Sequence, residues 1–129
     1  MVLVDTSVFI NFFRGKNTKG ARALEQLTEG GFCITPTIMQ ELLQGARDDA
    51  EFETLLSYLG TQLFCYPMDP LGTYEEAARI YLEARKRGFT IRSTIDCLIA
   101  QIAIEHKIPL LHEDKDFEQI ASFSKLKIF

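Results

Sequence analysis

The chain has 129 residues, of which 47% are hydrophobic and 25% are charged, and this composition predicts one folded domain over residues 1–129 with a buried core. It contains no apolar run of the ~18 residues that a membrane-spanning helix needs, and its first ten residues do not resemble a signal peptide, so we expect a cytoplasmic protein with no membrane partner. The net charge of −4, from 14 basic and 18 acidic residues, argues by itself against nucleic-acid binding.

Short apolar runs alternate along the chain with amphipathic stretches of helical spacing. In the first half we expect a strand at Val2–Val4, a helix capped by Thr6 or Ser7, a helix at Lys19–Thr28 followed by Gly30-Gly31, a strand at Phe32–Thr35, a helix from Pro36 to near Gly45, and a helix from Asp48 or Asp49 to Gly60. In the second half we expect a strand at Leu63–Tyr66, a long helix from Tyr74 to Gly88, a helix capped by Ser93 or Thr94, a strand at Leu110-Leu111, a helix at Phe117–Ala121 and an edge strand at Lys127–Phe129.

Strands that are separated by helices favour parallel pairing with right-handed crossovers. The sequence therefore predicts an α/β fold, with three α/β/α layers around a central parallel sheet of four or five strands. In open parallel sheets, ligands bind beyond the carboxyl ends of the strands, so we expect a functional site at that edge.

The three cysteines, Cys33, Cys65 and Cys97, are widely spaced, and no CxxC motif is present. Their odd number and spacing argue against a disulfide framework and against a structural zinc site. Because each lies among apolar residues, we expect all three to pack in the core.

Acidic residues from four segments fall at the carboxyl edge of the predicted sheet. Asp5 ends the first strand, Glu41 lies early in the helix after the second strand, and Asp96 lies in the first turn of a later helix. Asp114 and Asp116 follow the last central strand. These five acids are far apart in sequence but are expected to converge.

Carboxylates that lie a few ångströms apart cannot all stay ionised without a counter-charge. Oxygen ligands without a histidine or cysteine partner suit Mg²⁺ or Mn²⁺. Taken singly, Asp96 is explained as a helix cap or dipole partner, Glu41 as a residue on a solvated helix face, and Asp116 as the cap of the last helix. Their common edge favours a metal site instead, and without these five the chain has 13 acidic and 14 basic residues, a balance that permits a nucleic-acid substrate.

Three segments resemble the motifs of PIN domains, and especially those of the VapC-type toxins of type II toxin–antitoxin systems. They are VDTSVFINFFRG at 4–15, ITPTIMQELLQGAR at 34–47 and RSTIDCLIAQIAIEHKIPLLHEDKDFEQIA at 92–121. Together they keep the family's order and spacing over nearly the whole chain.

The resemblance implies a PIN fold, an Mg²⁺- or Mn²⁺-dependent endoribonuclease, a homodimer that can assemble further with its antitoxin, and inhibition by that small cognate antitoxin. By position, the core metal-site acids are Asp5, Glu41 and Asp96. The D-x-D-F ending offers both Asp114 and Asp116; we expect Asp114 to be the direct ligand and Asp116 to be an outer or water-mediated one.

Several residues near these motifs are expected to support the site. Thr6 is expected to orient Asp5 or a metal-bound water through its hydroxyl. Arg14 follows the first expected helix and Arg92 precedes Asp96, so both could flank the site and are candidates for contact with RNA or the antitoxin. His112 stands where many members of the family have Thr or Ser; a structural role is favoured over a catalytic one, but its role stays open.

Some alternatives also stay open. Phe12 and Phe13 either form part of an antitoxin groove or pack in the core, and Tyr74 and Tyr81 are candidates for a dimer contact. A phosphoaspartyl hydrolase is disfavoured because Asp5-Thr6-Ser7 lacks the second Asp of D-x-D. A receiver domain is disfavoured because the chain lacks the acidic pair that such a domain has near its N-terminus. A catalytically inactive PIN-like module that binds RNA or protein is the remaining alternative, against which the intact acid set argues.

Overall fold

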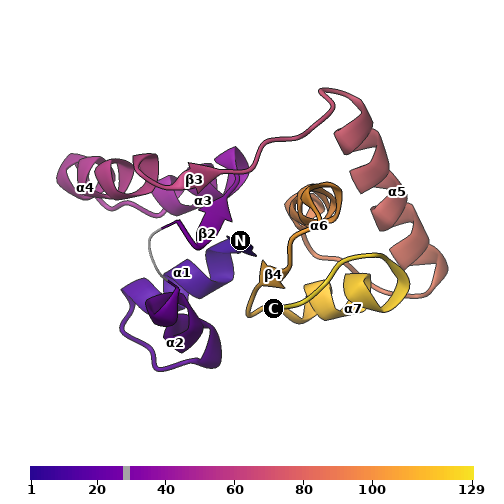
Figure 1. Ribbon diagram of the computed structural model, residues 1–129, viewed down its shortest axis with the longest axis horizontal. Helices are drawn as coiled ribbons and strands as arrows, with labels where there is room; N and C mark the ends of the chain where they lie inside the picture. Colours follow the sequence, from indigo (N-terminus) through magenta and orange to yellow (C-terminus); the bar gives the residue numbers. More distant parts are fainter. Residues whose placement is uncertain (28–29) are drawn as a thin grey trace.

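A four-stranded parallel sheet lies at the centre of the fold, as Figure 1 shows for the computed structural model, which describes residues 1–27 and 30–129. The strands are β1 (Val2–Val4), β2 (Phe32–Ile34), β3 (Leu63–Phe64) and β4 (Leu110–Leu111), in the order β3-β2-β1-β4. The helices are α1 (Thr6–Phe13), α2 (Lys19–Gln26), α3 (Pro36–Gln44), α4 (Asp49–Gly60), α5 (Gly72–Lys86), α6 (Thr94–His106) and α7 (Lys115–Phe123).

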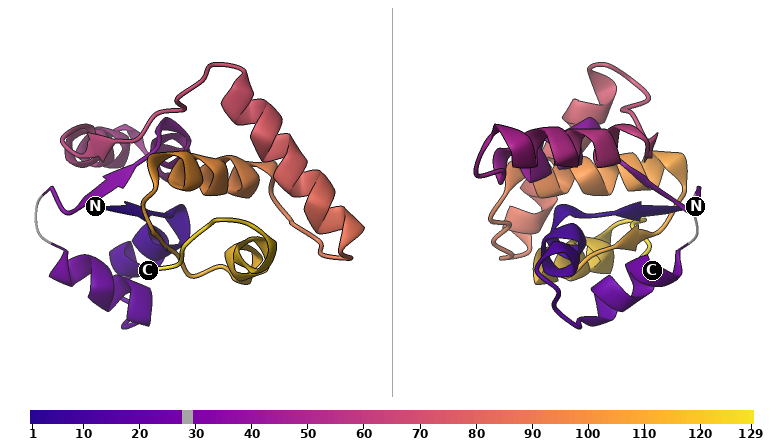
Figure 2. Two further views of the ribbon diagram at one scale, coloured as in Figure 1. Left: turned by 45° about the vertical axis from the view of Figure 1, so that its right-hand side comes forward. Right: turned by 90° about the vertical axis from the view of Figure 1, so that its left-hand side faces the viewer.

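The pairing of the strands confirms the predicted parallel sheet. Leu3 of β1 pairs with Cys33 on one side and with Leu110 on the other, so β1 lies between β2 and β4. Helices cover both faces of the sheet: α1, α2 and α7 lie on one face, α3, α4 and α6 lie on the other, and α5 packs outside α6 (Figure 2). This arrangement is the expected three-layer architecture.

Three of the expected strands are shorter than predicted, and the second ends at Ile34 rather than Thr35. The third ends at Phe64 rather than Tyr66, although the N–H of Cys65 still donates to the carbonyl of Ile34 at 2.8 Å. The last is reduced to a single parallel bridge between Ile128 and Leu110. The second helix ends at Gln26, and its expected end at Thr28 lies outside the described residues.

The helix caps differ from the prediction at two places. The cap of α1 is Asp5, not Thr6 or Ser7, because the Asp5 backbone is extended (φ −76°, ψ 157°) and its carboxylate accepts the N–H of Ser7. Helix α7 begins at Lys115, earlier than predicted, because Asp114 caps it by accepting the N–H of Asp116. Two of the five predicted site acids therefore also fix the start of a helix.

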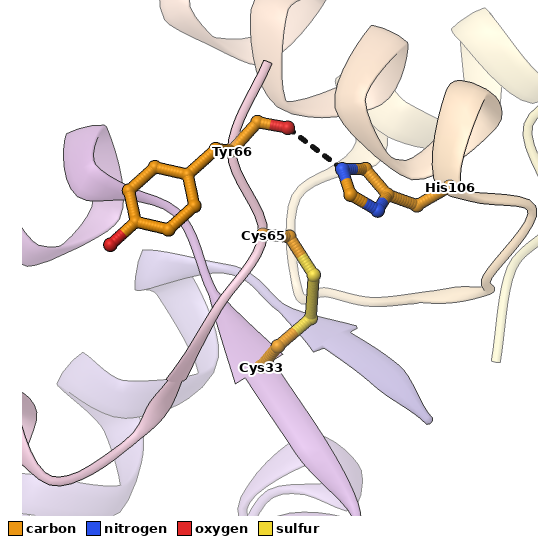
Figure 3. The surroundings of a disulfide bond; sticks show 4 residues. All are labelled: Cys33, Cys65, Tyr66 and His106. Atoms are coloured by element: carbon orange, nitrogen blue, oxygen red, sulfur yellow. Dashed lines mark hydrogen bonds between the residues drawn. A yellow bond between two sulfur atoms is a disulfide. The ribbon is translucent and has the colours of Figure 1, made fainter. Parts of the chain in front are cut away.

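Cys33 and Cys65 form a disulfide, which Figure 3 shows beside the hydrogen bond from His106 Nε2 to the carbonyl oxygen of Tyr66. The prediction that the cysteines form no disulfide was wrong for this pair. Parallel pairing of β2 and β3 brings the two Cα atoms to 6.1 Å, although 32 positions separate them in sequence. The expectation of burial is confirmed for all three cysteines, and Cys97 is free.

The core fills both faces of β1, and its largest fully buried side chains include Phe9, Leu3, Ile99, Ile102 and Phe117. Helix α6 contributes six buried residues, more than an amphipathic surface helix needs, because α5 covers its outer side. No helix in the described part of the chain combines the length and apolarity that crossing a bilayer requires.

Candidate metal centre

A hollow of about 310 Å³ opens at the carboxyl ends of β1 and β4. Its lining residues come from the end of β1, from helices α1, α3 and α6, and from the segments before α6 and α7: Asp5, Thr6, Ser7, Ile10, Glu41, Arg92, Ser93, Asp96 and Asp114. The hollow thus gathers four of the five predicted acids at the expected edge of the sheet.

The fifth acid lies next to this group. One carboxylate oxygen from each of Asp96, Asp114 and Asp116 lies within 4.8 Å of the other two, which is close enough to hold one metal ion. Asp116 is buried, with 1% of its surface exposed, whereas Asp114 faces the hollow. The two members of the D-x-D-F ending therefore approach the same point from different depths.

Asp5 is the most enclosed acid of the hollow. Its Oδ2 accepts the N–H of Ser7 at 3.0 Å and the hydroxyl of Ser7 at 2.6 Å. Burial raises the pKa of Asp5, and the two hydrogen bonds from Ser7 act against this rise. The side chain is thus fixed in orientation by the residue two positions ahead.

Glu41 reaches the hollow from α3 and is oriented by Thr6. The Thr6 hydroxyl donates to Glu41 Oε1 at 3.1 Å, so the contact of this hydroxyl is with Glu41 rather than with Asp5. Burial raises the pKa of Glu41, the bond from Thr6 lowers it, and the charge of Asp5 raises it further. Thr6 therefore links α1 to α3 across the site.

Asp96 experiences the strongest charge crowding. Its pKa is raised from 3.8 to about 7, first by burial and then by the negative charges of the four other acids, Asp5, Asp114, Asp116 and Glu41. A cation bound at this carboxylate would offset both the cost of burying its negative charge and the repulsion from the neighbouring acids.

Arg92 supplies positive charge at this point. Its Nη2 donates to Asp114 Oδ1 at 2.9 Å, and its Nε donates to Asp116 Oδ2 at 3.3 Å. The backbone N–H of Arg92 also donates to Asp116 Oδ2 at 3.1 Å. Asp116 therefore accepts hydrogen bonds from both the backbone and the side chain of Arg92. The other predicted arginine, Arg14, lies at the end of α1 and lines a different groove.

The donor set fits a hard divalent cation. The described residues that line the hollow offer carboxylate and hydroxyl oxygens, and none of them is a histidine or a cysteine. Mg²⁺ and Mn²⁺ prefer such oxygen ligands, whereas zinc sites usually contain nitrogen or sulfur. Burial raises the pKa values of Asp5, Glu41 and Asp96, and neighbouring negative charges add to the rise at Glu41 and Asp96.

Ser7 is a residue of the site that sequence reasoning did not single out for this purpose. We expected Ser7 only as a cap of α1, although an Asp side chain commonly accepts the backbone N–H two residues ahead. Ser7 bonds to the Asp5 carboxylate because Asp5, rather than Thr6 or Ser7, is the cap of α1.

A family model described as a PIN domain matches residues 2–122, a range that includes every acid of the hollow. The chain belongs to the PIN-domain family.

Within this family the chain is similar to mycobacterial ribonucleases. It is 35% identical over 130 residues to "Ribonuclease VapC11" of Mycobacterium tuberculosis, which covers 98% of this chain and 96% of the relative. The protein named "VapC ribonuclease Mb1587" of Mycobacterium bovis matches with the same identity and coverage.

Solved structures show the same fold. The structure of VapBC-1 from nontypeable Haemophilus influenzae matches with a TM-score of 0.75 at 18% identity, covering 100% of this chain and 97% of that chain. A toxin–antitoxin complex from Klebsiella pneumoniae matches with a TM-score of 0.73 at 18% identity, covering 98% and 95%. The predicted fold class is thereby confirmed.

Proposed function

We propose that the chain is a metal-dependent endoribonuclease that acts as the toxin of a type II toxin–antitoxin pair. The observation that carries this proposal is the convergence of carboxylates from four distant segments on one hollow. Support comes from the 35% identity, over nearly the whole chain, to proteins named as ribonucleases.

We assign Asp5, Glu41, Asp96 and Asp114 as the catalytic residues, which would hold Mg²⁺ or Mn²⁺ through their carboxylates. The metal would lower the pKa of a water molecule and offset negative charge on the scissile phosphate. Ser7 and Thr6 orient Asp5 and Glu41, so that these carboxylates are fixed before the substrate arrives. Asp116, beneath Asp114 and bonded to Arg92, is assigned as an outer ligand.

Hydrolysis at this site would cut an RNA phosphodiester by in-line attack of water and leave a 5′-phosphate and a 3′-hydroxyl. Arg92 is the cation placed to contact the RNA backbone, because its side chain is 64% exposed and reaches the hollow. On metal and substrate binding, its contacts with Asp114 would be exchanged for contacts with phosphate.

An antitoxin is the proposed protein partner. A groove of about 610 Å³ between α1, α3 and α4 adjoins the hollow, because Ile10 and Glu41 line both. Phe13 lines this groove with 44% of its surface exposed, whereas Phe12 packs partly against the core. Arg14 borders the groove and is proposed to contact the antitoxin.

Inhibition would follow if the antitoxin inserted a basic side chain among the carboxylates. Arg92 already shows that a guanidinium fits against Asp114 and Asp116. One solved structure with this fold is a toxin–antitoxin complex from Klebsiella pneumoniae.

We further propose that residues 1–129 act as one domain, as a homodimer, in the cytoplasm where cellular RNA is found. Tyr74 and Tyr81 line an apolar groove of about 430 Å³ between α5 and α6, which supports a dimer contact there.

The proposal is tested by incubating RNA with the purified chain in Mn²⁺ or Mg²⁺ and mapping the ends of the products. Wild-type protein is expected to cleave, EDTA is expected to stop cleavage, and Asp5→Asn is expected to fold normally without cleaving. Cleavage that continues unchanged in EDTA would contradict the metal role. Binding of RNA without any cleavage would favour the inactive binding module instead.

A further inference from the structure

His112 connects the end of β4 to the start of α7, and both nitrogens of its ring have partners. Nδ1 accepts the backbone N–H of Asp114 at 3.0 Å, and Nε2 lies 3.1 Å from Glu118 Oε1. Because a backbone N–H can only donate, Nδ1 carries the lone pair and the ring proton lies on Nε2, which donates to Glu118. The two bonds select one tautomer and one ring orientation.

Packing holds the imidazole in that orientation. The His112 side chain is 6% exposed, and its ring centroid lies 5.2 Å from that of Phe117, which is fully buried. Rotating the ring would break both hydrogen bonds and leave the Asp114 N–H without this acceptor, which is costly in a partly buried position. His112 thus presents a rigid acceptor to the turn.

The turn held in this way carries one of the proposed metal ligands. The N–H of Glu113 donates to Ser7 Oγ at 3.0 Å, and the Ser7 hydroxyl in turn donates to Asp5 Oδ2. Asp114 Oδ1 accepts the N–H of Asp116 at 3.0 Å. The successive amides of residues 113 and 114 are therefore fixed by two acceptors, Ser7 from α1 and His112 from the turn itself.

We propose that His112 is a positioning residue of the metal centre, which acts through the backbone of Asp114 to aim the Asp114 carboxylate into the hollow. His112 is not among the described residues that line the hollow, so its effect on a metal ion is indirect. The inference rests on the proposed metal-binding function. It assigns to this imidazole the task of a hydrogen-bond acceptor, not of a base or a metal ligand.

The two ring nitrogens can be separated by substitution. Asparagine at position 112 retains an acceptor near the place of Nδ1, because an Asn side chain commonly accepts the N–H two residues ahead. Glutamine places its amide near Nε2 instead, and leucine keeps the apolar bulk against Phe117 without any acceptor. His106→Asn is a matched control, because His106 is the only other histidine of the sequence. It lies at the C-terminal end of α6, whereas Asp96 lies in the first turn, and it bonds to the carbonyl oxygen of Tyr66.

Mn²⁺ affinity of the metal-free proteins, measured by isothermal titration calorimetry, tests the proposal. Wild type, His112→Asn and His106→Asn are expected to agree within about threefold, whereas His112→Gln and His112→Leu are expected to bind about tenfold more weakly, as for other changes next to ligands. Equal affinity in all five proteins would overturn the proposal. Loss in His112→Asn as large as in His112→Leu would also overturn it.

A second measurement covers a variant that is destabilised. Amide hydrogen exchange at Asp114, followed by NMR without metal, is expected to be slow in wild type and His112→Asn and at least about tenfold faster in His112→Leu. Equal protection in all three would overturn the proposal whatever their melting temperatures. If wild type itself binds no Mn²⁺, the proposed metal centre is contradicted. If wild type and the variants bind Mn²⁺ with equal affinity, only the proposed role of His112 is contradicted.

Discussion

The two sides of β1 are held together by different chemistry. On the β2 and β3 side, a disulfide joins Cys33 to Cys65 next to buried apolar residues. On the β4 side, the segments that carry Asp114 and Asp116 are joined by Arg92 and by hydrogen bonds, without a covalent link in the described residues.

Because of this difference, we expect the disulfide side of β1 to contribute mainly to the stability of the fold and the β4 side mainly to metal binding. The covalently linked side contributes Glu41 through α3, whereas the other side contributes Asp96, Asp114 and Asp116. Because charge repulsion concentrates on the second side, changes in pH, metal and nearby charge should act mainly there. Reducing agents should act mainly on the first.

The largest effect is expected from Asp96→Asn. This change removes the acid with the most strongly raised pKa and one of three oxygens that lie within 4.8 Å of one another, so cleavage of RNA should fall by more than about a hundredfold. The fold should persist, and the metal-free variant should be more stable than wild type at pH 8, because a repelled carboxylate is gone. End-mapped cleavage and thermal unfolding measure the two effects.

Asp49→Asn is the matched control, since Asp49 lies in the first turn of α4 and is exposed. It should leave cleavage unchanged. An Asp96→Asn protein that cleaves as well as this control would remove Asp96 from the site.

Reduction of the disulfide should have the largest effect on stability. The link closes a segment with a sequence separation of 32, for which loop-closure entropy predicts about 3 to 4 kcal/mol of stabilisation. Denaturant unfolding with and without a phosphine reductant measures the loss, and Cys65→Ala, which cannot form the link, should not respond to the reductant. Mn²⁺ affinity should change by less than about twofold; a larger change would mean that the two sides are not independent.

The stability of the metal-free protein should fall as the pH rises from about 4 to 7. The pKa of Asp96 is 3.8 without the fold's influence and about 7 in the folded protein, so unfolding releases a proton in this interval and is favoured by higher pH. Burial raises the pKa values of Asp5 and Glu41 in the same direction.

Mn²⁺ should reverse this trend because it binds the ionised carboxylates. At a hundredfold excess over its dissociation constant it should add about 2.7 kcal/mol at pH 8. Thermal unfolding from pH 4 to 8, with and without Mn²⁺, gives both slopes. Metal-free stability that rises steadily with pH would contradict the crowding of charge at Asp96.

A smaller effect is expected from Arg92→Gln. Without the guanidinium, Asp114 and Asp116 lose their cationic partner, so the metal-free protein should melt a few degrees lower. The increase in melting temperature on adding Mn²⁺ should then exceed that of wild type, because the metal ion takes over a task that Arg92 performed. Equal increases in both proteins would show that Arg92 and the metal do not share the acids.

The sequence predicted the fold well because alternating apolar runs and amphipathic stretches determine which segments are strands and helices. The ends of elements were predicted less well, since Asp5 and Asp114 were considered as ligands and not as the caps of α1 and α7. The disulfide could not be predicted because it depends on the order of the strands, which places Cys33 beside Cys65.

The convergence of the acids was expected from their places at the ends of strands and in the first turns of helices, but their hydrogen-bond partners were not expected. The contact of Arg92 with Asp114 and Asp116 joins residues 22 and 24 positions apart and depends on how the segment before α6 lies against α7. The hydrogen bond from Thr6 to Glu41 likewise depends on the packing of α1 against α3. Side-chain pairing across elements follows from tertiary packing, which periodicity does not encode.

The most direct measurement is anomalous X-ray scattering from crystals soaked in Mn²⁺. An anomalous peak is expected in the hollow, in contact with the carboxylates of Asp5, Asp96 and Asp114, and it should be absent from crystals of Asp96→Asn. A peak found only at exposed acids, or an empty hollow in crystals of the wild-type protein at saturating Mn²⁺, would contradict the assignment of this carboxylate cluster as a metal centre.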